Sequence, residues 1–139
     1  MKPCVIDTDT LSEILKQKNP QVLAHAEAYF QQFGTFVFSA ITWYEIVRGL
    51  RASRATTKLT RFEEFSSRSL VLPITPRVLD LAADLWVAGL GRRPRSYDAD
   101  FLIAATALEQ NAVLVTGNVR HFEWMPQLSV ADWREPTSS

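Results

Sequence analysis

Short β-forming segments alternate with helical segments along the whole chain, and this alternation limits the fold more than any other feature. The strand candidates are short apolar runs at 3–6, 35–38, 70–72 and 112–115, with a fifth candidate at 128–130. Between these runs, apolar residues recur at helical spacing. Strands separated by helices make βαβ crossovers, so we expect a parallel sheet with helices on both faces.

Several helix starts carry capping signals. Asn19-Pro20 and Thr75-Pro76 each place a capping side chain before a proline, which is a favourable first helical residue. We expect further helices at 8–17, 42–50, 59–65 and from Asp98 onward. Asp98 can cap the last of these helices, and Asp9 can cap the first.

The length and composition describe one ordinary domain. The chain has 139 residues, which we divide into a single domain at 1–134 and a tail at 135–139 that we expect to be disordered. No apolar run approaches the roughly 20 residues that cross a bilayer. Carboxylates near the N-terminus disfavour a signal peptide. The single cysteine, Cys4, has no partner for an internal disulfide and belongs to a strand that we expect to be buried. We therefore expect a cytoplasmic protein with no membrane contact.

Fifteen basic and fifteen acidic residues cancel, so only the distribution of charge is informative. One cationic stripe, which would occupy one face of a continuous helix, comprises Arg48, Arg51, Arg54, Lys58 and Arg61. A second group, the arginine loop, comprises Arg92, Arg93 and Arg95. These cations could hold phosphates or a protein partner, and a solvated helix face is the alternative for the stripe.

Three acids are placed where a parallel sheet would bring them together. Asp7 closes the first strand, and Glu45 is expected on the first turn of the helix after the second strand. Asp100 is expected on the first turn of the helix before the fourth strand. Ligand sites of such sheets lie beyond the carboxyl ends of the strands. We therefore expect the three carboxylates to share one cleft.

A shared cleft of carboxylates is unfavourable unless a cation neutralises it. Oxygen-only ligands suit Mg²⁺ or Mn²⁺, and no Cys/His cluster indicates zinc. The alternative for Glu45 and Asp100 is a favourable interaction with a helix dipole. Ser39 and Thr116, the polar residues that follow two other strands, have satisfaction of loop backbone groups as their alternative role.

Four segments resemble PIN-domain ribonucleases of the VapC and FitB toxin type. They are VIDTDTLSE with Asp7, SAITWYEIVRG around Glu45, DADFLIAATALEQNAVLVTGN from Asp98, and HFEWMP after it. The resemblance extends over nearly the whole chain. It implies a PIN-like three-layer α/β/α fold with a central parallel sheet of four to five strands.

The resemblance also implies a function and a site. The chain would be the toxin of a type II toxin–antitoxin system, an endoribonuclease that cleaves single-stranded RNA with a water activated by Mg²⁺ or Mn²⁺. Asp7, Glu45 and Asp100 match the metal ligands, and Thr116 and Asn118 match residues lining the same site. Such toxins commonly dimerise and are inhibited by a cognate antitoxin, in heterotetramers or larger assemblies.

An excess of aromatic residues on the expected helices also favours a homodimer and an antitoxin groove. These residues are Tyr29, Phe30, Phe33, Trp43, Tyr44 and Trp86.

Two departures from the family pattern concern the metal site. The family usually has asparagine at the position of Asp9, and often has a further acid at the positions of Asn118 or His121. The missing acid favours one firmly bound ion over two.

Two other functions remain open from the sequence. A PIN-fold module could bind RNA or protein without cutting it, although the three acids argue against this. A HAD-type phosphatase would use Asp7 as nucleophile and Asp9 as acid/base, but Leu11 and the short chain depart from that pattern.

Overall fold

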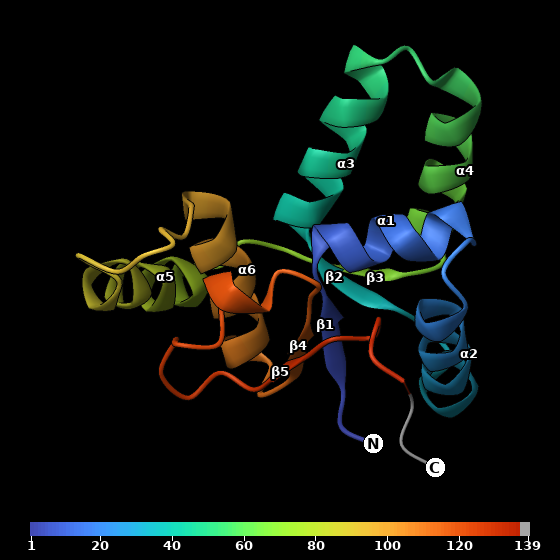
Figure 1. The fold of residues 1–139 in the computed structure, drawn as a ribbon. Coiled ribbons are helices and arrows are strands. Elements are labelled where there is room, and N and C mark those ends of the chain that lie inside the picture. The colour runs from blue at the N-terminus through green and yellow to red at the C-terminus, as the bar shows by residue number, and fades with distance from the viewer. Residues whose placement is uncertain (137–139) are drawn as a thin grey trace.

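The computed structural model describes residues 1–136 as an α/β fold in which the strands are very short (Figure 1). In chain order the elements are β1 (Cys4–Ile6), α1 (Thr8–Lys16), α2 (Pro20–Phe33), β2 (Val37–Ser39), α3 (Ala40–Ala52), α4 (Thr56–Ser67), β3 (Leu70–Leu72), α5 (Pro76–Ala88), α6 (Asp98–Glu109), β4 (Val113–Val115), η1 (Val119–His121) and β5 (Val130–Ala131). The five strands match the expected segments with shifts of one or two residues at their ends.

The strands are parallel, as the crossovers require. β1 pairs with β4 and β4 pairs with β5, while β2 pairs with β3. The strands β1 and β2 lie next to each other and join the two hydrogen-bonded parts into one layer (Figure 1). The expected sheet of four to five parallel strands is therefore confirmed, with its ladder divided into a three-stranded and a two-stranded part.

Side chains of β1 alternate between two hydrophobic cores, one on each face of the sheet. Val5 packs into the core that α5 and α6 cover. Cys4 and Ile6 pack into the other core, which α1 to α4 line. Because successive residues of a strand point to opposite faces, this short strand anchors both outer layers. The three-layer arrangement is thereby confirmed.

Helix starts agree with the capping signals at Asn19 and Thr75 and differ at Asp98 and at Asp9, which is described with the candidate site. Asn19 and Thr75 cap α2 and α5 through their side chains, as expected. Asp98 is not a cap, because the N-cap of α6 is Tyr97 and Asp98 is the first helical residue. The backbone amide of Tyr97 is instead satisfied by the side chain of Asp100, at 2.9 Å.

The cationic stripe does not lie on one continuous helix, so its members do not share one helix face. α3 ends at Ala52 and α4 begins at Thr56, which makes a helical hairpin (Figure 1). Arg54 lies in the turn between them with a φ of 54°. Lys58 and Arg61 therefore belong to a different helix from Arg48 and Arg51.

The C-terminal segment after β5 packs against α2. The Glu135 carbonyl accepts a hydrogen bond from His25 Nε2 at 2.9 Å, and the His25 ring stacks on Trp133 with centroids 5.9 Å apart. Of the tail expected at 135–139, residues 137–139 lie outside the described residues. Within residues 1–136, no helix is long and apolar enough to span a membrane.

Candidate active site

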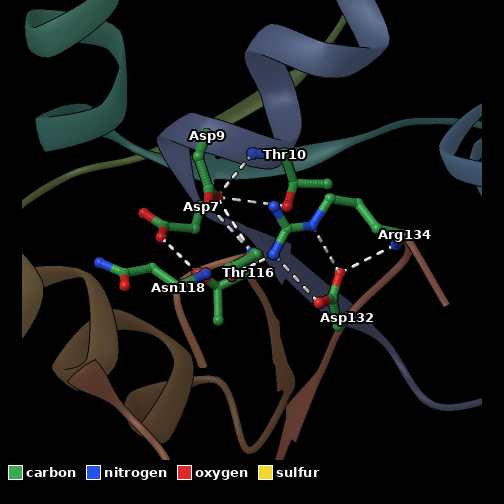
Figure 2. A network of polar contacts seen from close by, with 8 residues as sticks. Asp7, Asp9, Thr10, Thr116, Asn118, Asp132 and Arg134 are labelled. Carbon is green, nitrogen blue, oxygen red and sulfur yellow. Dashed lines mark hydrogen bonds and ion pairs between the residues drawn. The ribbon is translucent and has the colours of Figure 1, made fainter. Parts of the chain in front are cut away.

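Asp7 lies at the carboxyl end of β1 and is the most buried acid of the candidate site. It is 6% exposed, and its backbone amide continues the parallel ladder to the Val115 carbonyl at 2.8 Å. Its carboxylate accepts a hydrogen bond from the Thr116 hydroxyl at 2.7 Å (Figure 2). It accepts another from the Thr8 amide at 2.8 Å. The β1–β4 pairing thus brings Asp7 and Thr116 to one edge, as expected for these two residues.

Burial raises the pKa of Asp7 to about 7. The neighbouring charge of Asp9 also raises this pKa, and that of Asp100 does so to a smaller extent. The hydrogen bonds from Thr116 and the Thr8 amide act in the opposite direction. A carboxyl group with this pKa is disfavoured in its ionised form near neutral pH, so a bound cation would relieve the site.

Glu45 lies on the second turn of α3, so the expectation of a first-turn position was wrong. Its Oε1 accepts a hydrogen bond from the Thr8 hydroxyl at 2.7 Å, and its Oε2 lies 3.7 Å from Arg48 Nη2. Because it lies beyond the first turn, a helix-dipole role is no longer an adequate explanation for it. Thr8 directly follows Asp7, so one threonine connects the neighbourhoods of both acids.

Asp100 lies on the first turn of α6, as expected, and its Oδ2 has two partners. It accepts a hydrogen bond from the Tyr97 amide at 2.9 Å and lies 3.1 Å from Nδ1 of His121. The side chains of Asp100 and His121 are only 15% and 17% exposed. Asp100 therefore satisfies a helix end and is also close enough to affect the charge of Asp7.

The loop after β4 carries the other two candidate residues. Thr116 is fully buried, and besides its bond to Asp7 its hydroxyl accepts a hydrogen bond from the Asn118 amide at 3.0 Å. Asn118 is exposed beside it (Figure 2). Thr116 thus does satisfy a loop backbone group, and in addition holds the Asp7 carboxylate.

Asp9 does not cap α1, contrary to expectation. The N-cap is Asp7, whose side chain accepts the Thr8 amide. The Asp9 carboxylate accepts hydrogen bonds from the Thr10 amide at 2.7 Å and from the Gly117 amide at 3.0 Å. Asp9 therefore links the start of α1 to the loop after β4.

The donors near Asp7 fit a divalent cation in chemistry and charge. They are carboxylate oxygens, which Mg²⁺ and Mn²⁺ prefer, and they surround a buried acid whose pKa is raised by two others. The arrangement of these side chains does not yet form a complete coordination site. Among residues 1–136, no three His, Cys, Asp or Glu side chains converge closely enough to hold an ion. The carboxylates of Asp7, Glu45 and Asp100 would have to come closer together to surround one ion.

Sequence reasoning missed three contacts in and beside the candidate site, although it had already named His121 as a position of the family's metal site. These contacts join Thr8 to Glu45, His121 to Asp100, and the Arg134 guanidinium to the Gly117 carbonyl. Thr8 was detectable, since it adjoins the strand-ending acid. The other two contacts join separate segments at the ends of strands and helices, for which the sequence carries no local signal.

Comparisons with known proteins agree with this architecture. The sequence pattern of the PIN domain matches residues 4–124. Ribonuclease VapC1 of Haemophilus influenzae is 26% identical over 130 residues, covering 93% of this chain and 96% of that protein. Ribonuclease VapC19 of Mycobacterium tuberculosis is 35% identical over 95 residues, 65% of this chain and 69% of that protein. In a DNA-bound VapBC structure from Salmonella typhimurium, one chain matches with a TM-score of 0.77 and 28% identity, over 96% of this chain and 99% of that one. Because the family pattern spans most of the chain and the fold agrees, this protein belongs to the PIN-domain family.

Proposed function

We propose that this chain is the toxin of a type II toxin–antitoxin pair and a Mg²⁺- or Mn²⁺-dependent endoribonuclease that cleaves single-stranded RNA. The relatives named above are ribonucleases, and the Salmonella typhimurium structure is a VapBC complex. The observation that carries the proposal is Asp7, a buried carboxylate at the strand ends whose pKa is raised to about 7 by burial and by neighbouring acids.

In this proposal Asp7, Glu45 and Asp100 hold the ion. A bound divalent cation would lower the pKa of a water molecule and neutralise charge that develops on the phosphodiester. Thr116 and Asn118 line the site, with Thr116 keeping Oδ2 of Asp7 in place.

The remaining contacts orient the other two acids. Thr8 donates to Glu45, and the Tyr97 amide and His121 hold Oδ2 of Asp100. These partners leave Oδ1 of Asp100 available to a ligand.

RNA would be held next to Asp100 by the arginine loop. Arg92, Arg93 and Arg95 line a cavity of about 100 Å³ together with Trp86 and Ser96. Ser96 donates a hydrogen bond to the His121 carbonyl at 2.6 Å, which fixes this cavity to the residue that contacts Asp100. A cationic cavity with an aromatic wall suits the phosphates and bases of a single strand.

A cognate antitoxin and a second copy of the chain are the proposed protein partners. Of the six aromatic residues singled out above, Tyr29 is buried, whereas Phe30, Tyr44 and Trp86 are 51%, 53% and 43% exposed. Leu79 and Val87, on the same helix α5, are also exposed, at 53% and 61%. We assign the α5 surface to the homodimer, and light scattering at micromolar concentration would test this. A monomer would contradict it.

A cleavage assay separates the proposed enzyme from a binding module. Purified protein should cut a single-stranded RNA only when Mn²⁺ or Mg²⁺ is present, and Asp7→Asn should not cut. RNA binding without cleavage by the wild type in Mn²⁺ would favour the binding module. The HAD-type phosphatase is excluded by the PIN fold.

A further inference from the structure

Gly117 is bound on both sides by side chains of opposite charge. Its amide donates to Asp9 Oδ2 at 3.0 Å and to Oδ1 at 3.3 Å. Its carbonyl accepts a hydrogen bond from Nη2 of Arg134 (Figure 2). One residue of the loop after β4 is thus held by the start of α1 and by the segment that follows β5.

The guanidinium of Arg134 is itself fixed by Asp132. Asp132 Oδ1 accepts from the Arg134 amide at 2.9 Å and from Nε at 3.3 Å, and Oδ2 lies 3.3 Å from Nη2. The hydrogen bond with Asp132, and then the charges of Asp132 and Asp9, raise the pKa of Arg134. Arg134 therefore stays charged and oriented although its side chain is 50% exposed.

The two side chains approach so closely that a Cβ atom at position 117 would require them to shift. Such an atom would lie 2.6 Å from Cζ of Arg134 and 2.8 Å from Oδ2 of Asp9. Gly117 does not have a positive φ, so backbone conformation alone does not require glycine there. A side chain at position 117 would therefore displace Asp9 and Arg134 from their contacts with this residue.

We propose that Asp9, Gly117 and Arg134 form a clamp, the Gly117 clamp, through which the C-terminal segment positions the loop 116–118 against Asp7. The loop contains Thr116, which bonds Asp7, and Asn118, whose amide bonds Thr116. Arg134 is a positioning residue in this arrangement, because it acts on the site through Gly117. The effect of the clamp on RNA cleavage rests on the proposed function, whereas the contacts that form the clamp do not.

The clamp also gives Asp9 a role other than metal binding. Both its carboxylate oxygens accept backbone hydrogen bonds, from Thr10 and from Gly117. Arg134 supplies positive charge near this additional acid. The effect of Asp9 on the position of the loop 116–118 should therefore depend on Arg134, and the effect of Arg134 should depend on Asp9.

Amide hydrogen exchange at Gly117 and Asn118 tests the clamp in metal-free protein. Arg134→Gln should increase exchange at both amides about three- to tenfold, the effect of losing one net hydrogen bond. Gly117→Ala, with Arg134 intact, should do the same at Asn118, because its Cβ displaces the clamping side chains. Arg77→Gln is the matched control, since Arg77 is an exposed arginine whose one ion pair within residues 1–136 is with Asp80, at 3.4 Å.

A double-mutant cycle then tests the coupling. Asp9→Ala and Arg134→Gln should each lower kcat/KM about three- to tenfold, and the double variant should be no worse than the more severe single variant. If amide exchange increases in every clamp variant, the clamp is upheld. If the wild-type protein at the same time cuts no RNA, the proposed function is refuted while the clamp stands. Wild-type exchange at Asn118 in both Arg134→Gln and Gly117→Ala, or fully additive losses of kcat/KM, would overturn the clamp.

Discussion

The Thr116 hydroxyl donates to Oδ2 of Asp7 at 2.7 Å and so joins two side chains that are 109 positions apart in sequence. The bond follows directly from the parallel register of β1 and β4, which pairs Ile6 with Val115. Each partner is the first residue after its strand. The bond also favours the ionised form of a carboxylate that burial and neighbouring acids disfavour. Thr116 therefore affects the charge of Asp7 as well as its position.

Removing the Thr116 hydroxyl should raise the pKa of Asp7 further. In Thr116→Val the acidic limb of the pH–rate profile should shift to higher pH, and Mn²⁺ affinity at pH 7 should fall, because protons compete better for Asp7. Thr116→Ser keeps the hydroxyl and should retain the wild-type profile. Rate profiles and Mn²⁺ titrations over pH 6 to 9 measure both effects. A Val variant with the wild-type profile would show that the bond is without consequence.

The raised pKa of Asp7 should make the metal-free protein less stable as pH rises from about 4 to 7. An unfolded aspartate ionises near 3.9, while Asp7 in the folded protein keeps its proton until about 7. Over this interval the unfolded state binds fewer protons, so the free energy of unfolding decreases with pH. Asp7→Asn removes this dependence. Its stability relative to wild type should increase by up to about 4 kcal/mol between pH 4 and 8, from about 1.4 kcal/mol per pKa unit.

Denaturant unfolding of both proteins across this pH range, in EDTA, provides the measurement. Adding Mn²⁺ should stabilise the wild type more at pH 8 than at pH 6 and should not stabilise Asp7→Asn. A stability difference between the two proteins that is constant with pH would contradict the raised pKa.

The sequence predicts the elements of this fold better than the ends of those elements. The alternation of strands and helices and the Asn19 and Thr75 caps are local signals, and the structure agrees with them. The errors occur where tertiary contacts decide between local options. Asp9 and Asp98 are both adequate caps, but Asp7 and Tyr97 occupy the cap positions. The turn between α3 and α4, by contrast, falls in the gap between the helices expected at 42–50 and 59–65, and a left-handed arginine, Arg54, forms it.

In the candidate site, too, some contacts can be predicted from the sequence, whereas others depend on tertiary packing. Topology predicts that Asp7 and Thr116 meet, because both end neighbouring parallel strands. The contact of His121 with Asp100 and that of Arg134 with Gly117 depend on how a 3₁₀ turn and the C-terminal segment pack. Neither packing leaves a periodic or spaced signal in the sequence.

Substitutions of Asp98 and Asp100 should differ sharply in their effect on RNA cleavage, although both residues lie in the first turn of α6. Asp98 is exposed, so Asp98→Ser should retain near-wild-type cleavage. Asp100→Asn should lose most activity and weaken Mn²⁺ binding, since it removes a charge close to Asp7. Full activity in purified Asp100→Asn would refute its assignment as a ligand. Comparable losses in both variants would mean that Asp98 also belongs to the site.

The losses from Asp7→Asn, Glu45→Gln and Asp100→Asn should not add. If the three carboxylates share one ion, the first substitution already removes most of the benefit that the other two provide. Single-turnover rates and Mn²⁺ affinities of the single and double variants measure this. Losses that multiply independently would indicate that the three acids do not serve a common ion.

RNA should be held by the arginine loop and not by the end of α3. Arg92 stacks on Trp124 with 4.7 Å from its Cζ to the ring centroid, and Trp124 donates to the His121 carbonyl at 3.0 Å, so this loop is tied to the Asp100 side of the site. Arg51 lies six residues beyond Glu45, about 9 Å farther along the helix axis. Arg54 lies in the turn of the α3–α4 hairpin, which projects from the rest of the fold (Figure 1).

Two matched double charge reversals separate these surfaces. Arg92→Glu with Arg95→Glu should weaken RNA binding about tenfold or more at low salt and flatten the salt dependence by about 0.7 per lost phosphate contact. Arg51→Glu with Arg54→Glu changes the net charge equally and should leave RNA affinity nearly unchanged. Mn²⁺ affinity should be unchanged in both variants, because within residues 1–136 the arginine that pairs with one of the three acids is Arg48, which neither variant changes. Equal loss of RNA affinity in the two variants would mean that overall charge, and not the arginine loop, attracts the RNA.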